Sequence, residues 1–337
     1  MARKRSRLAA ALILAAPCLW IAPAEADDVM RLGVPLDCEA GVACFVQQYP
    51  DFDPGPGAAD PFCGTKTYGG HDGTDIRALS MADVERGLPV LALGSGEVLR
   101  ARDGVADRLV TTPADRQAVD GQECGNGLVL ALASGLEVQY CHLKNGSLRV
   151  KPGESVEQGD VVGMVGASGD AEFPHVHLTL RKSGAVIDPA TGRGLSEGCL
   201  LDAEKAEPLW SETAQGWMKA ADDPILAIGL SGVPPTYARL VVAGPPKDLA
   251  AGDGATVGWG WFANLVEGDR IRIVIAAPDG SLLSDSTSDP LDRPKAAYLQ
   301  FAGRKRAPLP GTYGLRVEVM RVGRVVAARE TSVDVDD

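Results

Sequence analysis

Histidine is scarce in this chain, with only 4 among 337 residues. None follows His177, and no cysteine follows Cys199, so we expect the C-terminal part to have neither a metal site nor a disulfide of its own. No CxxC pair occurs anywhere, which argues against a zinc site built from cysteines. Any histidine chemistry of the protein is therefore confined to the part of the chain that ends at His177.

Long amphipathic helices and an excess of basic residues are missing as well. The 40 glycines and 23 prolines divide the chain into short apolar runs, which favours short strands over long helices. Lysine and arginine number 33, against 45 aspartates and glutamates, and the formal net charge is −12. Such a charge repels nucleic acid and anionic lipid, so we expect neither DNA nor RNA as a partner.

The N-terminus has the features of a secretory signal peptide over residues 1–26. The basic segment MARKRSR precedes the apolar stretch LAAALILAAPCLWIA, and Ala24-Glu25-Ala26 provides a small-x-small cleavage site. A membrane anchor is the alternative, but this stretch is short for a span and no later stretch is suitable, so we expect no transmembrane segment in the mature chain. The protein is therefore predicted to be exported, to the periplasm or the extracellular space. Cleavage would remove four cationic residues and one acidic residue, which changes the net charge from −12 to −15.

Cysteine usage agrees with export. Of 7 cysteines, Cys18 lies in the predicted signal peptide, and an even number remains, which indicates three disulfides. The segment LVLALASGLEVQYC reads as two strands around Ser134-Gly135, and folding it back brings Cys124 toward Cys141. The other two pairs then follow by elimination: Cys38 with Cys44, and Cys63 with Cys199.

The length of 337 residues and a hydrophobic fraction of 45% allow two domains. Short strand-like runs between turn signals predict a β domain over residues 67–199. An irregular, disulfide-tied lead-in over residues 27–66 precedes it, and a polar linker over residues 200–224 follows. Residues 100–123 form a long polar segment that interrupts the strands, and we interpret it either as a groove wall or as a disposable insertion.

The strand-like pattern resumes after the linker, over residues 225–337. Five runs with β-branched and aromatic residues alternate with turns, and Ile225–Gly229 and Ala238–Val242 are two additional candidate strands. This density of strands predicts a β-sandwich of immunoglobulin type. The fold class of the whole protein is therefore predicted to be all-β.

The four histidines, together with one aspartate, form a recognisable pattern. His175 and His177 lie in the strand-like segment HVHLTL, and side chains two residues apart on a strand point to the same face. His71 and Asp75 belong to GGHDGTD, where the glycines disfavour a helix, so we expect a loop that runs into a strand at Thr74–Ile76.

Two imidazoles and a carboxylate suit zinc, with the fourth position open for water, which is the arrangement of catalytic rather than structural zinc sites. More candidates are present than three ligand positions require, and two would remain as acids or bases beside a single zinc ion. The five candidates are His71, Asp75, His142, His175 and His177.

The order of the segments HDGTDI, GLPVLALGSGEVLRA, GNGLVLAL, YCHL, VKPGESVEQGDVVGMVGASG, PHVHLTL and IDP resembles the M23 metallopeptidases, the lysostaphin-like or LytM-like family, over residues 66–190. The resemblance implies a mostly antiparallel β fold with a narrow groove, one zinc ion, and hydrolysis of peptide bonds in peptidoglycan. By position it implies His71, Asp75 and His177 as zinc ligands and His142 and His175 as the catalytic pair.

The chain departs from the family pattern at three places. Cys141 stands where alanine is usual in YxHL, which a disulfide would explain, and SGDAEFPH lacks the usual glycine, which affects the shape of the groove. Tyr68 lies near the position of the family's oxyanion-stabilising tyrosine, but at a different offset from the first histidine.

Other classes of function remain open at this point. One is a non-hydrolytic module of the same fold that binds cell wall or activates a hydrolase. Another is a lipoyl-type carrier domain around VKPGESVEQGDVVGMVG, but neither Lys144 nor Lys151 stands at the required tight turn. The C-terminal domain could bind a wall polymer or a protein partner, or cover the catalytic domain. The scissile bond could belong to a D-amino-acid cross-link or to a glycine bridge.

Overall fold

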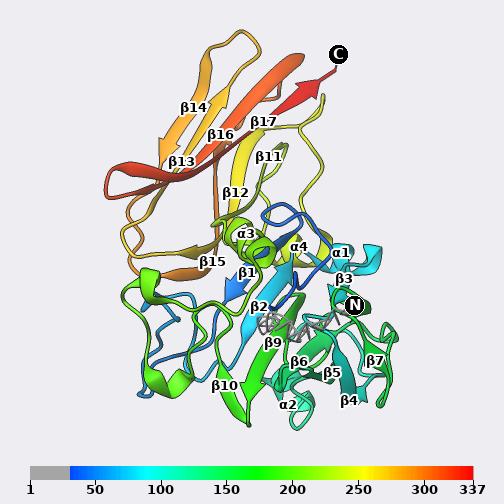
Figure 1. Ribbon diagram of the computed structural model, residues 1–337. Coiled ribbons are helices and arrows are strands. Elements are labelled where there is room, and N and C mark those ends of the chain that lie inside the picture. The colour runs from blue at the N-terminus through cyan, green and yellow to red at the C-terminus, as the bar shows by residue number, and fades with distance from the viewer. Residues whose placement is uncertain (1–30, 337) are drawn as a thin grey trace, which may run out of the picture.

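The computed structural model describes residues 31–336, in which two β-rich regions pack against each other (Figure 1). The predicted signal peptide, including Cys18, lies outside the described residues. Within the described residues, no helix has the length and apolar composition needed to cross a membrane.

The first region is built on an eight-stranded sheet in which every pairing is antiparallel. Its order is β1-β2-β9-β6-β5-β4-β7, with β10 paired to β9. The strands are β1 (Cys44–Gln48), β2 (Thr74–Ala78), β4 (Gly96–Arg102), β5 (Asn126–Leu132), β6 (Leu136–Leu143), β7 (Ser155–Val156), β9 (His175–Lys182) and β10 (Ala185–Ile187). A separate two-stranded ribbon consists of β3 (Pro89–Leu91) and β8 (Val161–Met164).

The second region is a sandwich of a three-stranded and a four-stranded sheet, as expected for an immunoglobulin-like fold. The sheet orders are β11-β12-β15 and β14-β13-β16-β17. Along β13, isoleucines at every second position are buried, which is the period-two pattern that the sequence predicted. The strands are β11 (Ile225–Ser231), β12 (Thr256–Leu265), β13 (Arg270–Ala276), β14 (Leu282–Thr287), β15 (Lys295–Arg304), β16 (Gly311–Arg321) and β17 (Arg324–Val335).

Helices are short throughout the described residues. In α1, Ser80 caps the first turn by accepting a hydrogen bond from the backbone N–H of Asp83, and the Asp83 carboxylate accepts one from the Ser80 N–H. The helices are α1 (Met81–Arg86), α2 (Pro113–Ala118), α3 (Glu212–Ala221) and α4 (Tyr237–Ala243), and two 3₁₀ turns span η1 (Leu195–Glu197) and η2 (Ala203–Lys205).

The segment Ala238–Val242 is helical, and its prediction as a strand was wrong. Thr236 accepts a hydrogen bond from the Arg239 N–H as an N-cap, and Gly244 ends the helix with a φ of 77°. The segment buries the consecutive residues Leu240 and Val241. Over so few residues, the positions of the apolar side chains do not distinguish a helix from a strand.

Two further expectations need correction. The lead-in over residues 27–66 is not wholly irregular, because Cys44–Gln48 forms β1 at the edge of the main sheet. Strand β14 (Leu282–Thr287) was overlooked, since four of its six residues are small or polar and only Ser284 is buried. Both strands lie at sheet edges, and the apolar run of β1 is only three residues long, which is too short to identify a strand by its period.

Three disulfides are present, all in the first region, and they join the pairs that the sequence put forward. These are Cys38–Cys44, Cys63–Cys199 and Cys124–Cys141, with sequence separations of 6, 136 and 17 residues. The second bridge ties the lead-in to the segment that follows η1, and the third joins the end of the polar segment to β6.

Each region has its own apolar core, and a third cluster joins the two. The joining cluster includes Phe45 of β1, Leu240 of α4 and Trp261 of β12, none of which is exposed to solvent. The polar segment before β11 also packs inward, because Trp210 and the α3 residues Ala214 and Met218 belong to the core of the first region. The β-sandwich is therefore docked on the first region through buried apolar side chains.

Candidate active site

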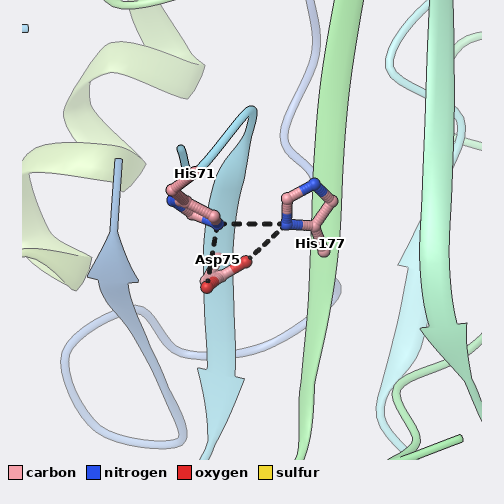
Figure 2. A group of neighbouring side chains, drawn as sticks. All are labelled: His71, Asp75 and His177. Atoms are coloured by element: carbon pink, nitrogen blue, oxygen red, sulfur yellow. Dashed lines mark hydrogen bonds and ion pairs between the residues drawn. The ribbon is translucent and has the colours of Figure 1, made fainter. Parts of the chain in front are cut away.

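The neighbouring strands β2 and β9 bring three predicted ligands together (Figure 2). Asp75 and His177 are directly opposite each other in the antiparallel register, and the Nδ1 of His177 lies 2.8 Å from a carboxylate oxygen of Asp75. His71, in the turn before β2, has its Nε2 3.2 Å from the other Asp75 oxygen and 3.2 Å from the Nδ1 of His177. One donor atom from each residue lies within 4.8 Å of the other two.

A glycine lets this turn approach β9 closely. A Cβ added to Gly73 would lie 2.6 Å from the Nε2 of His177 and 2.6 Å from the carbonyl oxygen of Leu178. Any side chain at this position would displace the imidazole or the strand, which explains the glycine in HDGTD.

Hydrogen bonds on the far side of each ring orient the donor atoms. The Nδ1 of His71 lies 2.7 Å from the carbonyl oxygen of Tyr49, and because a carbonyl only accepts, this nitrogen carries the proton. The Nε2 of His177 lies 3.1 Å from Asp72 and 2.9 Å from the hydroxyl of Thr179. The His71 Nε2 and the His177 Nδ1 thereby point toward Asp75, and the His177 Nδ1 would become a metal donor once it releases the proton that it shares with Asp75.

Asp75 and His177 each favour the charged form of the other. Burial alone would raise the pKa of Asp75, but the neighbouring imidazoles of His71 and His175 and the hydrogen bonds from His177 lower it well below its usual value. Burial alone would lower the pKa of His177, but Asp72 and Asp75 outweigh it and raise that pKa to about 9. The ionised carboxylate of Asp75 attracts a divalent cation, which would replace the proton on the basic nitrogen of His177.

A second pair of imidazoles, His142 and His175, stands beside the first group. Their ring centroids are 4.5 Å apart, and the Nε2 of His175 lies 3.6 Å from Asp75. Each Nδ1 donates to a backbone carbonyl at 2.8 Å, from His142 to Ser168 and from His175 to Phe173. In both rings the Nε2 therefore has a free lone pair.

Burial keeps this second pair neutral. It lowers the pKa of His142 well below the usual value, with His175 and His177 adding to the effect, and it lowers the pKa of His175. At neutral pH both rings are therefore uncharged proton acceptors at Nε2. His142 also has a positive φ of 62°, and its N–H donates to the Cys124 carbonyl at 2.8 Å. The residue after the disulfide-bonded Cys141 therefore adopts a left-handed backbone conformation.

Two hollows meet at these histidines, one of about 560 Å³ and one of about 240 Å³. They share Tyr68, Asp170, His142 and His177, so the imidazoles stand where the hollows join, between the two ends of a cleft. This is the position at which a bound chain would cross the reactive groups.

All five residues singled out in the sequence come together, and Asp72 beside them was missed. Asp72, which follows the first histidine, orients His177, and Tyr68 stacks on His71 with ring centroids 4.6 Å apart. Asp72 was detectable as the second residue of HDG, next to a candidate ligand. The polar segment 100–123 supplies Arg116 to the larger hollow and Glu123 to the smaller one, so it forms a wall of the cleft.

Comparison with known proteins identifies the family to which the segment with these residues is similar. Residues 69–189 match peptidase family M23. The chain is 31% identical over 120 residues to the cell division protein DipM of Caulobacter vibrioides, a match that covers 36% of this chain and 16% of DipM. It is also 31% identical over 115 residues to the DD-carboxypeptidase/endopeptidase Mpg of Neisseria meningitidis, covering 34% of this chain and 24% of Mpg. The chain thus matches less than a quarter of the length of these relatives.

Among solved structures, the catalytic domain of a mutant of the prophage-encoded M23 protein EnpA from Enterococcus faecalis is 25% identical, with a TM-score of 0.28. That match covers 42% of this chain and 82% of the EnpA domain. The family match spans the strands and loops that carry all five candidate residues, from the turn before β2 to the end of β10. Residues 69–189 of this chain are a domain of peptidase family M23.

Proposed function

We propose that the protein is a zinc-dependent endopeptidase that hydrolyses peptide bonds of peptidoglycan. One observation carries the proposal: two imidazole nitrogens and a carboxylate oxygen converge within 4.8 Å, beside two further neutral imidazoles in a cleft. A purely structural zinc site would use four protein ligands and would not need uncommitted bases next to it.

The donor set fits zinc. His71, Asp75 and His177 would hold one zinc ion through the Nε2 of His71, the Nδ1 of His177 and the carboxylate. Both imidazoles have their other nitrogen tied to an acceptor, which fixes the tautomer a metal needs. When bound, zinc supplies Lewis acidity and a lowered pKa for coordinated water.

The second pair would move protons. His142 and His175 each present an unprotonated Nε2, so one of them takes a proton from the attacking water. The ring that has taken up this proton can then hydrogen-bond to the tetrahedral intermediate through its Nε2–H and pass the proton to the leaving amine. Their symmetric hydrogen bonding to backbone carbonyls leaves both assignments of base and acid open to experiment.

The substrate assignment follows the relatives and the cleft. The name of Mpg describes a DD-carboxypeptidase/endopeptidase, and we extend peptide-bond hydrolysis to this chain. A cleft made of two adjoining hollows suits an extended peptide better than a small molecule. Peptidoglycan, with its short exposed peptides, is the substrate class that we propose, either at a cross-link or within a stem peptide.

Three disulfides support export, since such bridges persist in oxidising compartments. We therefore propose a periplasmic or extracellular location, where peptidoglycan is accessible.

The test combines metal analysis with turnover. The purified mature chain should contain about one zinc per molecule and release peptide-bearing fragments from isolated sacculi, and chelation followed by added zinc should abolish and restore release. Mass analysis of digested defined muropeptides would identify the bond. A protein that takes up zinc but releases nothing from sacculi or muropeptides would be a binding or activating module instead, and a protein that takes up no metal would overturn the proposal entirely.

A further inference from the structure

The β-sandwich borders the larger hollow of the cleft. Tyr237 at the start of α4 and Ala296 and Ala297 of β15 line this hollow together with His175 and His177. Tyr237 is 39% exposed, so its ring is accessible to a ligand in the cleft. One wall beside the reactive histidines therefore comes from a different part of the chain than the M23 domain.

This wall is fixed in place by contacts between the two regions. The Nε2 of Gln47 in β1 donates to the carbonyl oxygen of Ala296 at 2.7 Å. The side chain of Asn264 in β12 donates back to the carbonyl oxygen of Gln47 at 2.8 Å. Because these bonds flank the buried cluster that joins the regions, the wall cannot swing away without exposing apolar surface.

A buried arginine stands between the wall and the catalytic strands. Arg77 lies on β2 two residues after Asp75, and its side chain is fully buried. Its guanidinium lies 4.8 Å from the ring centroid of Trp261 in the sandwich and 5.0 Å from that of Phe173 in the M23 domain. Within the described chain no carboxylate lies within salt-bridge distance of Arg77, and it donates to Gln47 at 2.9 Å and to the Ala78 carbonyl at 3.2 Å.

An arginine without an acidic partner depends on these aromatic faces. The guanidinium of arginine stays charged in proteins. The two aromatic rings and the Gln47 amide then replace the water that the cation has lost. Removal of either ring would leave a buried charge less well solvated, so Arg77 would shift.

Phe173 transmits the position of Arg77 to a catalytic candidate. Its ring packs against the imidazole of His175 with centroids 4.5 Å apart, and its carbonyl oxygen accepts the Nδ1–H of the same imidazole at 2.8 Å. A continuous series of contacts therefore runs from Trp261 through Arg77 and Phe173 to His175.

We propose that the β-sandwich is part of the active site. Trp261 acts as a positioning residue that holds His175 through Arg77 and Phe173, and Tyr237 with Ala296 and Ala297 forms a wall of the substrate cleft. The kinetic part of this inference rests on the proposed peptidase function. The positioning part concerns His175 alone and is measurable without turnover.

A matched pair of variants in the full mature chain tests the positioning role. Trp259 and Trp261 lie on one face of β12, both are buried in the joining cluster, and both have an indole N–H without a partner in the described structure. Trp261→Leu removes the ring beside Arg77, whereas Trp259→Leu removes an equally buried indole that has no contact with Arg77 among the cation–ring contacts.

Nuclear magnetic resonance of ¹⁵N-histidine-labelled protein reports on the rings directly, because the chain has only 4 histidines. We expect the ring signals of His175 to shift in Trp261→Leu and to stay at their wild-type positions in Trp259→Leu. Trp261→Phe, which keeps a ring beside the guanidinium, should restore most of the wild-type signal. Identical spectra for Trp261→Leu and Trp259→Leu would overturn the positioning role, whether or not the protein is a peptidase.

Turnover separates the two contributions. In Trp261→Leu we expect kcat to fall about 10- to 100-fold with unchanged zinc content and little change in KM, because a catalytic group is displaced. In Tyr237→Ala we expect KM to rise, because part of the cleft wall is lost, and kcat to fall less than in Trp261→Leu, because the Tyr237 ring packs edge-on against Trp261 with centroids 6.2 Å apart. An active wild-type enzyme with unaltered kinetics in both variants would refute the two-domain active site. An inactive wild type would instead refute the proposed peptidase function.

Discussion

The two regions of the molecule are stabilised by different means. The first contains all three disulfides and most of the buried polar side chains, including His71, Asp75, His142 and His175. The second has neither cysteine nor histidine and is held by an apolar core of isoleucine, leucine and valine. Polar groups buried for chemistry weaken a core, and covalent cross-links offset that loss, whereas a wall without reacting groups needs only good packing.

The two regions also differ in the hydrogen-bond partners of a buried carboxylate. In the second region, Asp269 is fully buried and receives two hydrogen bonds from Arg321, at 2.8 and 2.9 Å. In the first region, Asp188 is fully buried with one oxygen that has no partner in the described structure. The sandwich satisfies its buried charges, and the catalytic region tolerates unsatisfied ones.

The largest expected effect comes from the metal ligands. His177→Ala should lose bound zinc and all measurable peptidase activity, because two donors do not make a stable zinc site. In contrast, Val317→Ala in the core of the sandwich should reduce stability by roughly 1–3 kcal/mol and keep the metal. Metal analysis and thermal unfolding of both variants check the comparison, and retained stoichiometric zinc in His177→Ala would contradict the ligand assignment.

A smaller effect is expected at the second pair of imidazoles. His142→Ala should keep zinc and lose activity by about 100- to 10,000-fold, since it removes a proton-transfer group and not a ligand. Metal content and turnover on defined muropeptides are the measurements. Full activity in His142→Ala would eliminate this residue from the mechanism.

The disulfides should matter to one region only. The double variant Cys63→Ser/Cys199→Ser opens a loop of 136 residues, which costs about 5 kcal/mol in the chain-entropy view of cross-links. Hydrogen exchange should show lost protection in β9 and β10 and little change in β13 and β16. Equal loss in both regions would show that the protein unfolds as one cooperative unit, joined by the shared apolar cluster.

The smallest of these effects concerns pH and Asp188. Burial raises the pKa of Asp188 to about 6, and the hydrogen bonds from Thr191 only partly oppose this. The folded state therefore holds a proton that the unfolded state releases, so its stability is full below about pH 4 and falls as the pH rises through 6, by about 3 kcal/mol in total.

Paired variants isolate that contribution. Asp188→Asn should reduce the loss of thermal stability between pH 4 and pH 7, because the neutral amide does not ionise. Asp269→Asn in the sandwich should lower stability at pH 7, because it breaks the pair with Arg321. If the pH dependence of Asp188→Asn equals that of wild type, other groups are responsible for it.

Much of the catalytic region was predictable from the sequence, for identifiable reasons. His175 and His177 share a face because strand periodicity is two, and Asp75 stands at a strand start because glycines exclude a helix there. The pairing of Cys124 with Cys141 followed from a local hairpin. In each case the relevant residues are close in sequence or belong to regular β geometry.

The second region was predictable in class but not in detail. Alternation along β13 identified a sandwich strand. In contrast, the short segment Ala238–Val242, apolar except for Arg239, suited a helix and a strand equally, until the caps at Thr236 and Gly244 decided between them. Nothing in the sequence linked Trp261 to Arg77, because 184 positions separate two residues that only the docking of the regions brings together.

The sequence by itself determined which groups this protein has for chemistry: four histidines and one aspartate in a family-specific order, with His175 and His177 directed to one side by the period of their strand. Only the tertiary structure decided that the sandwich reaches the cleft, that Tyr237 faces it, and that an arginine without an acidic partner lies between two aromatic rings. The reason is that ligand chemistry and periodicity are local properties of a chain, whereas the packing of two cores depends on the shapes of surfaces that form only after folding.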